Sequence, residues 1–158
     1  MERTFVAKEV IELAIQIEVN GKDFYEALAT KSKNSKTKKI FSYLSEQEKE
    51  HIEKFTAILG SIASYEPKEA YPEEYFSYMN YLAGDKIFTQ KGKGKELAQK
   101  VEDEKEAIEM GIEAEKYSIT FYEAMKRLVP ENDKKKVEII MGEEKDHLKQ
   151  LEELKEGL

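Results

Sequence analysis

The stretch that decides the fold is Glu48-Lys49-Glu50-His51, in which a glutamate and a histidine stand three positions apart. On an α-helix such a pair shares one face, because three residues turn the chain by about 300° and advance it by about 4.5 Å. One helix can therefore offer a carboxylate oxygen and an imidazole nitrogen to the same metal ion. The chain has only two histidines, and the second is the last residue of another Glu-x-x-His motif, Glu144-Lys145-Asp146-His147.

Both motifs interrupt apolar heptad patterns. The residues seven positions before and after Glu48 are Phe41 and Phe55. The residues seven positions before and after each of the other three motif residues are Leu, Ile or Val. The four polar residues thus stand where the periodicity predicts core hydrophobic side chains. Because burying an unpaired carboxylate costs several kcal/mol, these side chains need a partner, and a metal ion would supply one.

The composition predicts an all-α protein with one domain over residues 1–158. Charged residues make up 37% of the chain, and glycine and proline number only 8 and 3, which favours long solvated helices. The net charge of −7 argues against nucleic acid as a partner, because phosphate contacts need a basic face. Without an apolar run of the ~18 residues that a membrane span needs, or a signal-peptide core, we expect a cytoplasmic protein without membrane contact. The lack of cysteine excludes disulfides, Cys-ligated zinc and an intrinsic rubredoxin-type iron centre.

Hydrophobic periodicity predicts four long helices. They span about 5–30, 35–59, 95–128 and 134–155. We expect Thr4 to cap the first helix, Asn34 or Ser35 to cap the second, and the turn at 131–133 to cap the fourth. Residues 61–94 break the periodicity with prolines and glycines and include a predicted short helix at 72–83. This segment is long enough to cross from one end of a bundle to the other, which predicts a four-helix bundle with a long crossover between its second and third helices.

An internal duplication accompanies the helices. Residues 11–28 align without gaps to 108–125, with eight of the eighteen positions identical, so that Glu18 matches Glu115. Tyr25 and Tyr122 also match, and they are either core aromatic residues or hydroxyl donors that orient a ligand carboxylate. The chain therefore looks like a duplicated helical hairpin with an approximate two-fold axis.

Six polar residues interrupt the predicted core: one glutamate on each of two helices, and a Glu-x-x-His pair on each of the other two. They are Glu18, Glu48, His51, Glu115, Glu144 and His147. A single such residue is usually a satisfied core residue, but six with symmetric spacing are hard to place without metal. The set is that of di-iron or di-manganese sites in bundle cores, where two divalent cations balance four carboxylates. Carboxylates and imidazoles without thiolate suit iron or manganese, and zinc would also bind, so the metal stays open.

With these residues the chain resembles the ferritin-like di-iron carboxylate proteins and, among them, the rubrerythrin branch. The resemblance covers nearly the whole chain and rests on the two Glu-x-x-His motifs and the two pairs Glu18 with Tyr25 and Glu115 with Tyr122. It implies a ferritin-like four-helix bundle that holds two irons. Each iron would be bound by one histidine, His51 or His147, and by one terminal glutamate, Glu18 or Glu115. Glu48 and Glu144 would bridge the two irons.

Two departures from that family concern function. Rubrerythrins typically carry a C-terminal rubredoxin domain with four cysteines that feeds electrons to the site, whereas this chain has no cysteine. They also usually have an extra glutamate three residues after the third-helix ligand, tied to redox-linked iron movement, where this chain has Ser118. The absence of that glutamate weakens a straight peroxidase assignment.

The resemblance implies an oxidoreductase that reduces hydrogen peroxide or dioxygen with electrons from a separate donor protein, and we expect a homodimer. One alternative is an iron-handling ferroxidase with Fe(II) as substrate, for which the lack of a ferritin-type fifth helix disfavours a cage. Another alternative is a non-catalytic bundle stabilised by metal.

Overall fold

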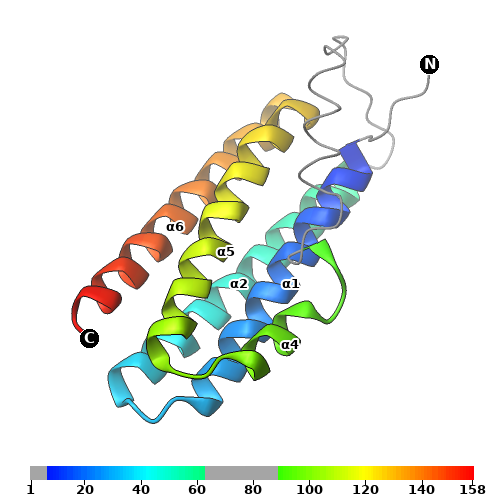
Figure 1. Cartoon of the computed structure of the whole chain (residues 1–158). Helices are drawn as coiled ribbons and strands as arrows, with labels where there is room; N and C mark the ends of the chain where they lie inside the picture. The colour runs from blue at the N-terminus through cyan, green and yellow to red at the C-terminus, as the bar shows by residue number, and fades with distance from the viewer. Residues whose placement is uncertain (1–6, 63–88) are drawn as a thin grey trace.

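The computed structural model describes residues 7–62 and 89–158, and within these ranges the chain is helical without a β-strand. Four long helices, α1 (Ala7–Lys31), α2 (Ser35–Ser61), α5 (Glu104–Met125) and α6 (Glu131–Glu156), form the bundle in Figure 1. A short helix, α4 (Lys93–Lys100), precedes α5, and a single 3-10 turn, η2 (Lys126–Leu128), follows it. The all-α bundle predicted from the periodicity is confirmed.

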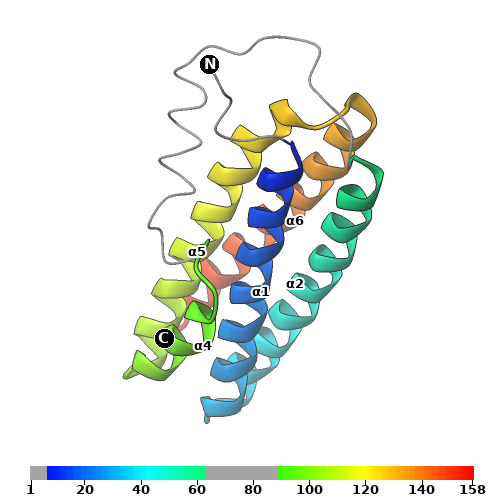
Figure 2. The same ribbon diagram turned by 90° about the vertical axis from the view of Figure 1, so that its right-hand side faces the viewer.

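The bundle consists of two antiparallel hairpins packed against each other. α1 and α2 form one hairpin and α5 and α6 the other, with α1 beside α5 and α2 beside α6 (Figures 1 and 2). α2 ends at the opposite end of the bundle from the start of α5, so these two helices run in the same direction (Figure 1). Two consecutive helices that run in the same direction must be joined by a long crossover, so the predicted crossover between the second and third long helices is confirmed.

Side-chain caps explain two helix starts, and one of them corrects a prediction. Asn34 starts α2, as expected, because its Oδ1 atom accepts a hydrogen bond of 3.0 Å from the backbone N–H of Thr37. The prediction of one continuous helix over 95–128 is wrong, since the chain leaves the helical conformation between α4 and α5. Asp103 is extended there and caps α5, its Oδ1 accepting a hydrogen bond of 2.8 Å from the N–H of Glu106.

The last long helix begins at Glu131, earlier than the predicted residue 134. Its N-cap is Pro130, whose ring fixes φ, here at −59°, so the three polar residues after it form the first helical turn. Glu131 and Asp133 are favourable in that turn, because the helix N-terminus carries a partial positive charge. The predicted Thr4 cap and the 72–83 helix lie outside the described residues.

The apolar core is divided into two clusters by a polar layer. One cluster contains residues such as Val10 and Phe55, and the other contains residues such as Phe24 and Leu151. On each long helix the predicted ligand residues fall between the part that enters the first cluster and the part that enters the second. The layer is therefore enclosed by packed hydrophobic side chains at both ends.

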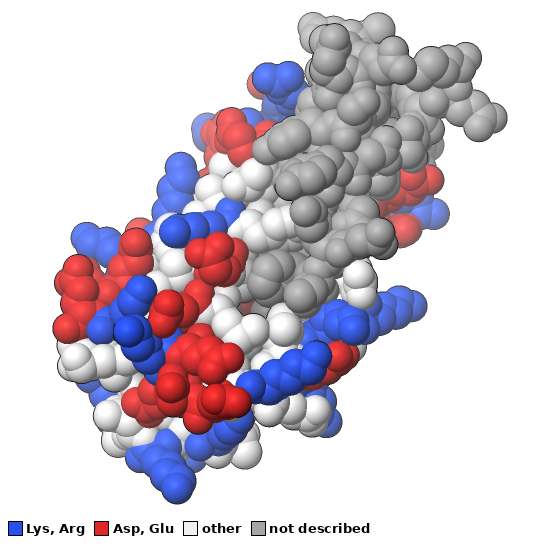
Figure 3. Space-filling view, viewed as in Figure 1, with Lys and Arg blue, Asp and Glu red and all other residues white. Residues whose placement is uncertain are grey.

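The outer faces of the helices are charged. Basic (Lys, Arg) and acidic (Asp, Glu) side chains are mixed over the described part of the face in Figure 3. Ion pairs between residues about one helical turn apart are common. Glu96 forms two of them, since its carboxylate lies 3.1 Å from the ammonium group of Lys93 and 3.3 Å from that of Lys100. None of the described helices combines the length and apolar character that crossing a membrane requires.

Candidate metal centre

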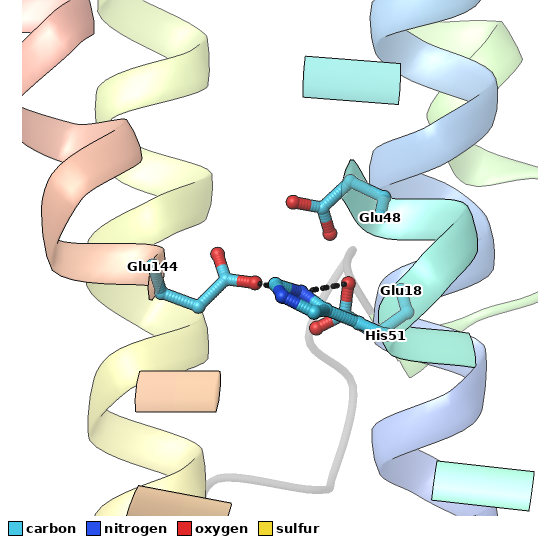
Figure 4. Close-up of side chains that lie close together, drawn as sticks. All are labelled: Glu18, Glu48, His51 and Glu144. Atoms are coloured by element: carbon cyan, nitrogen blue, oxygen red, sulfur yellow. Dashed lines mark ion pairs between the residues drawn. The ribbon is translucent and has the colours of Figure 1, made fainter. Parts of the chain in front are cut away.

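All six residues predicted to bind metal converge in the polar layer, where each of the four long helices contributes at least one. They form two overlapping groups in which one potential ligand atom of each residue lies within 4.8 Å of the others: Glu18, Glu48, His51 and Glu144, and Glu48, Glu115, Glu144 and His147. Glu48 and Glu144 belong to both groups, as the predicted bridging role requires. Figure 4 shows the first group, with side chains from α1, α2 and α6 directed at one another.

These side chains are buried, and each has at least one polar atom without a hydrogen-bond partner. The relative exposure of the six residues ranges from 0% for Glu18 to 3% for Glu48. Among the described residues, seven buried side-chain oxygen or nitrogen atoms have no hydrogen-bond partner, and all seven belong to these six residues. Unsatisfied buried polar atoms are rare in proteins, and seven of them directed at one place fit a site that a cation completes.

Both histidines direct the same ring nitrogen, Nδ1, at the glutamate carboxylates of the polar layer. Nδ1 of His51 lies 2.7 Å from Oε1 of Glu144 and 3.5 Å from Oε2 of Glu18. Nδ1 of His147 lies 3.7 Å from Glu48 and 3.8 Å from Glu144. None of these approaches has the geometry of a hydrogen bond. Each histidine therefore presents Nδ1 as its potential ligand atom.

The two tyrosines donate hydrogen bonds across the bundle, each from one hairpin to the other. The hydroxyl of Tyr25 on α1 lies 2.7 Å from Oε1 of Glu115 on α5, and the hydroxyl of Tyr122 on α5 lies 2.5 Å from Oε1 of Glu18 on α1. In both glutamates the Oε2 atom stays without a partner. Of the two roles considered for the tyrosines, the geometry is that of donors orienting a carboxylate.

Burial and mutual repulsion act on the carboxyl groups of the layer. Burial, followed by the charge of neighbouring glutamates, raises the pKa of Glu48 and Glu115 well above the ordinary value and also raises the pKa of Glu144. Burial alone would also raise the pKa of Glu18, but the closely approaching side chains of Glu48 and His51 lower it. Burial opposes a charge on His51, yet Glu144 and Glu18 raise its pKa to about 11. Protons thus compensate part of the negative charge when no cation does.

Glu143, which was not predicted from the sequence as part of the site, contacts His51 through Nε2, the ring nitrogen opposite Nδ1. Its Oε1 atom lies 2.9 Å from Nε2 of His51 and 3.4 Å from the ammonium group of Lys54. Partial burial would raise the pKa of Glu143, but the hydrogen bond from His51 and the charges of His51 and Lys54 lower it. A proton on Nε2 that is donated to Glu143 leaves the Nδ1 lone pair free for a metal ion.

A four-helix bundle with a buried layer of four carboxylates and two imidazoles is the architecture of the ferritin-like metal proteins. The rubrerythrin family model matches residues 9–155, so the chain belongs to the rubrerythrin family.

Two solved structures share the fold over nearly the whole chain. A structure described as a ferritin-like diiron-carboxylate protein from Thermotoga maritima is 26% identical, with a TM-score of 0.68 over 99% of this chain and 98% of that one. A hypothetical protein from Pyrococcus furiosus is 21% identical, with a TM-score of 0.67 over 96% of this chain and 89% of that one. Curated proteins gave no match.

Proposed function

We propose that this protein is a di-iron redox protein that reduces hydrogen peroxide or dioxygen with electrons from a separate donor protein. The observation that carries the proposal is the pair of overlapping ligand groups that share Glu48 and Glu144 and contain the unsatisfied buried atoms. Two divalent ions in these groups would balance the charge of the four carboxylates. When bound, two ferrous ions supply the two electrons that convert one peroxide molecule, with two protons, into two water molecules.

The residues around the site would prepare it for this chemistry. Tyr25 and Tyr122 hold one oxygen of each terminal carboxylate, which leaves the second oxygen for a metal ion. The apolar clusters on both sides of the layer limit the access of bulk water and strengthen electrostatic interactions inside it. The chain has no cysteine for an iron–sulfur or rubredoxin-type relay, so the proposal assigns re-reduction to another protein.

Ferroxidase chemistry with Fe(II) as the substrate is the second candidate, and the environment of Ser118 favours it. Ser118 is buried on α5, at the position where the family usually has a further glutamate. Its hydroxyl donates a hydrogen bond of 3.1 Å to the carbonyl oxygen of Ala114 in the same helix. The site therefore has no additional carboxylate at this position for redox-linked rearrangement.

Stopped-flow oxidation of the iron-loaded, anaerobically reduced protein tests the proposal. We expect peroxide to oxidise the site faster than dioxygen does, with a single turnover until a donor is added. The variant Glu48→Gln, which lacks a ligand shared by both groups, is the control and should show no fast phase. Dioxygen reacting as fast as peroxide, with many irons stored per chain, would favour the ferroxidase. Solution mass then separates a homodimer from a cage.

A further inference from the structure

The approximate two-fold symmetry of the ligands is broken at the rim of the site. The motifs 48–51 and 144–147 place Gln47 in the position that corresponds to Glu143, one residue before the shared glutamate. They also place Gln150 in the position that corresponds to Lys54, three residues after the histidine. A charged pair therefore accompanies one histidine, and two neutral amides take the corresponding positions near the other.

The His51 side is closed by the charged pair. Glu143 receives the hydrogen bond from Nε2 of His51, and Lys54 holds the same carboxylate oxygen from outside. The carboxylate fixes the rotation of the ring and the tautomer in which Nδ1 can bind metal, and it makes the imidazole a stronger ligand. The positive charge of Lys54 reduces the attraction of Glu143 for a cation but leaves this orientation in place.

On the His147 side, a surface pocket of about 420 Å³ lies between α2 and α6. Its lining includes His147, Gln47, Gln150 and Tyr43, and Glu143 also contributes to it. His147 itself is only 1% exposed. The ion pairs of His147 with described residues all involve Nδ1, and no described carboxylate lies within ion-pair distance of its Nε2 atom. The amide of Gln47 is instead directed at Glu50, 3.5 Å away. On this side the rings of His147 and Tyr43 lie nearly perpendicular, with their centroids 6.1 Å apart, and Tyr43 is 46% exposed.

We infer that the two metal positions are inequivalent: the position formed with Glu18 and His51 binds first and tightly, and the position formed with Glu115 and His147 binds second and exchanges. The inference rests on the proposed metal pair and adds an order of binding to it. Loss of an orienting partner of a ligand histidine typically lowers metal affinity about 10- to 100-fold. We expect a difference of that size between the two positions.

Anaerobic titration of the metal-free protein with Co(II), followed by calorimetry and by the visible spectrum of cobalt, measures the two affinities. Crystals loaded with one equivalent, with anomalous scattering at the cobalt edge, show which position fills first. The wild type should bind two ions with constants about 10- to 100-fold apart, and the first ion should lie beside His51. Glu143→Gln should weaken the first constant, whereas Gln47→Glu should strengthen the second.

Glu152→Gln is the matched control, because it removes one exposed negative charge from the same helix as Glu143 without contacting a histidine. It should leave the ratio of the two constants unchanged. Equal constants, equal occupancy at one equivalent, or a first ion beside His147 would overturn the inference and leave the metal pair standing. A wild-type protein that binds no Co(II) would contradict the metal pair itself, and the inference with it.

Discussion

The hydroxyl of Tyr122 lies 2.5 Å from Oε1 of Glu18, although the two residues are 104 positions apart and belong to different hairpins. Tyr25 and Glu115 repeat this arrangement in the opposite direction. The duplicated hairpins are thus joined at the metal layer by a reciprocal pair of hydrogen bonds. Each bond fixes a carboxylate that would otherwise be free to rotate in the core.

Tyr122→Phe should destabilise the metal-free protein by about 1–3 kcal/mol, because the variant leaves a buried carboxylate oxygen without its donor. Tyr25→Phe should have an effect of similar size on Glu115. Urea unfolding at neutral pH measures both. Unchanged stability in both variants would contradict the role of the tyrosines as donors that the buried carboxylates depend on.

Glu48→Ala and Glu144→Ala should each lose both metal ions, because each glutamate belongs to both ligand groups. Glu18→Ala should lose one ion, since Glu18 belongs to one group. Metal analysis after gel filtration gives the stoichiometry, and circular dichroism shows whether each variant is folded. The near-isosteric Glu48→Gln repeats the test should the alanine variant unfold. Full retention of two ions in the Glu48 variants would contradict the bridging assignment.

The metal-free protein should lose stability as the pH rises from 6.5 to about 9. The folded state raises the pKa of Glu48 and Glu115 above 4.5, so unfolding above that pH releases protons and a rising pH favours it. The contribution of His51, whose pKa rises from 6.5 to about 11, is complete below 6.5 and lost towards 11. The lowered pKa values of Glu18 and His147 act below this window.

Thermal unfolding of metal-free and metal-loaded protein across this pH range provides the measurement. The loaded form should change much less, because bound cations rather than protons then compensate the carboxylates. A melting temperature of the metal-free form that rises with pH in this window would contradict the assigned directions of the pKa shifts.

Gly94→Ala should destabilise the protein by about 1–3 kcal/mol, because an added Cβ would lie 1.9 Å from the carbonyl oxygen of Asn20. Gly94 brings α4 against α1 and donates its N–H to Oδ1 of Asn20 over 3.2 Å. Gly142→Ala is the control, since its Cβ would meet nothing within 4 Å in the interior of α6. That change should stabilise the helix by about 0.5–1 kcal/mol. Equal effects of the two substitutions in urea unfolding would contradict the close approach.

The bundle and its polar layer were predictable because Glu48 and its counterparts interrupt an otherwise regular apolar pattern. The break before α5 was not predicted, although Asp103 is a good N-cap and residues 102–106 are all charged, because charged residues also occupy the exposed face of a continuous helix. Glu143 was missed for a different reason. Its position on α6 carries no pattern of its own, and its contact with His51 depends on how α2 and α6 are rotated relative to each other.

A crystal structure of the iron-loaded protein with anomalous scattering at the iron edge tests the central claim most directly. We predict two iron peaks in the polar layer, one beside His51 and Glu18 and one beside His147 and Glu115, with carboxylate oxygens of Glu48 and Glu144 contacting both. A single peak, or iron bound only outside this layer, would contradict the account.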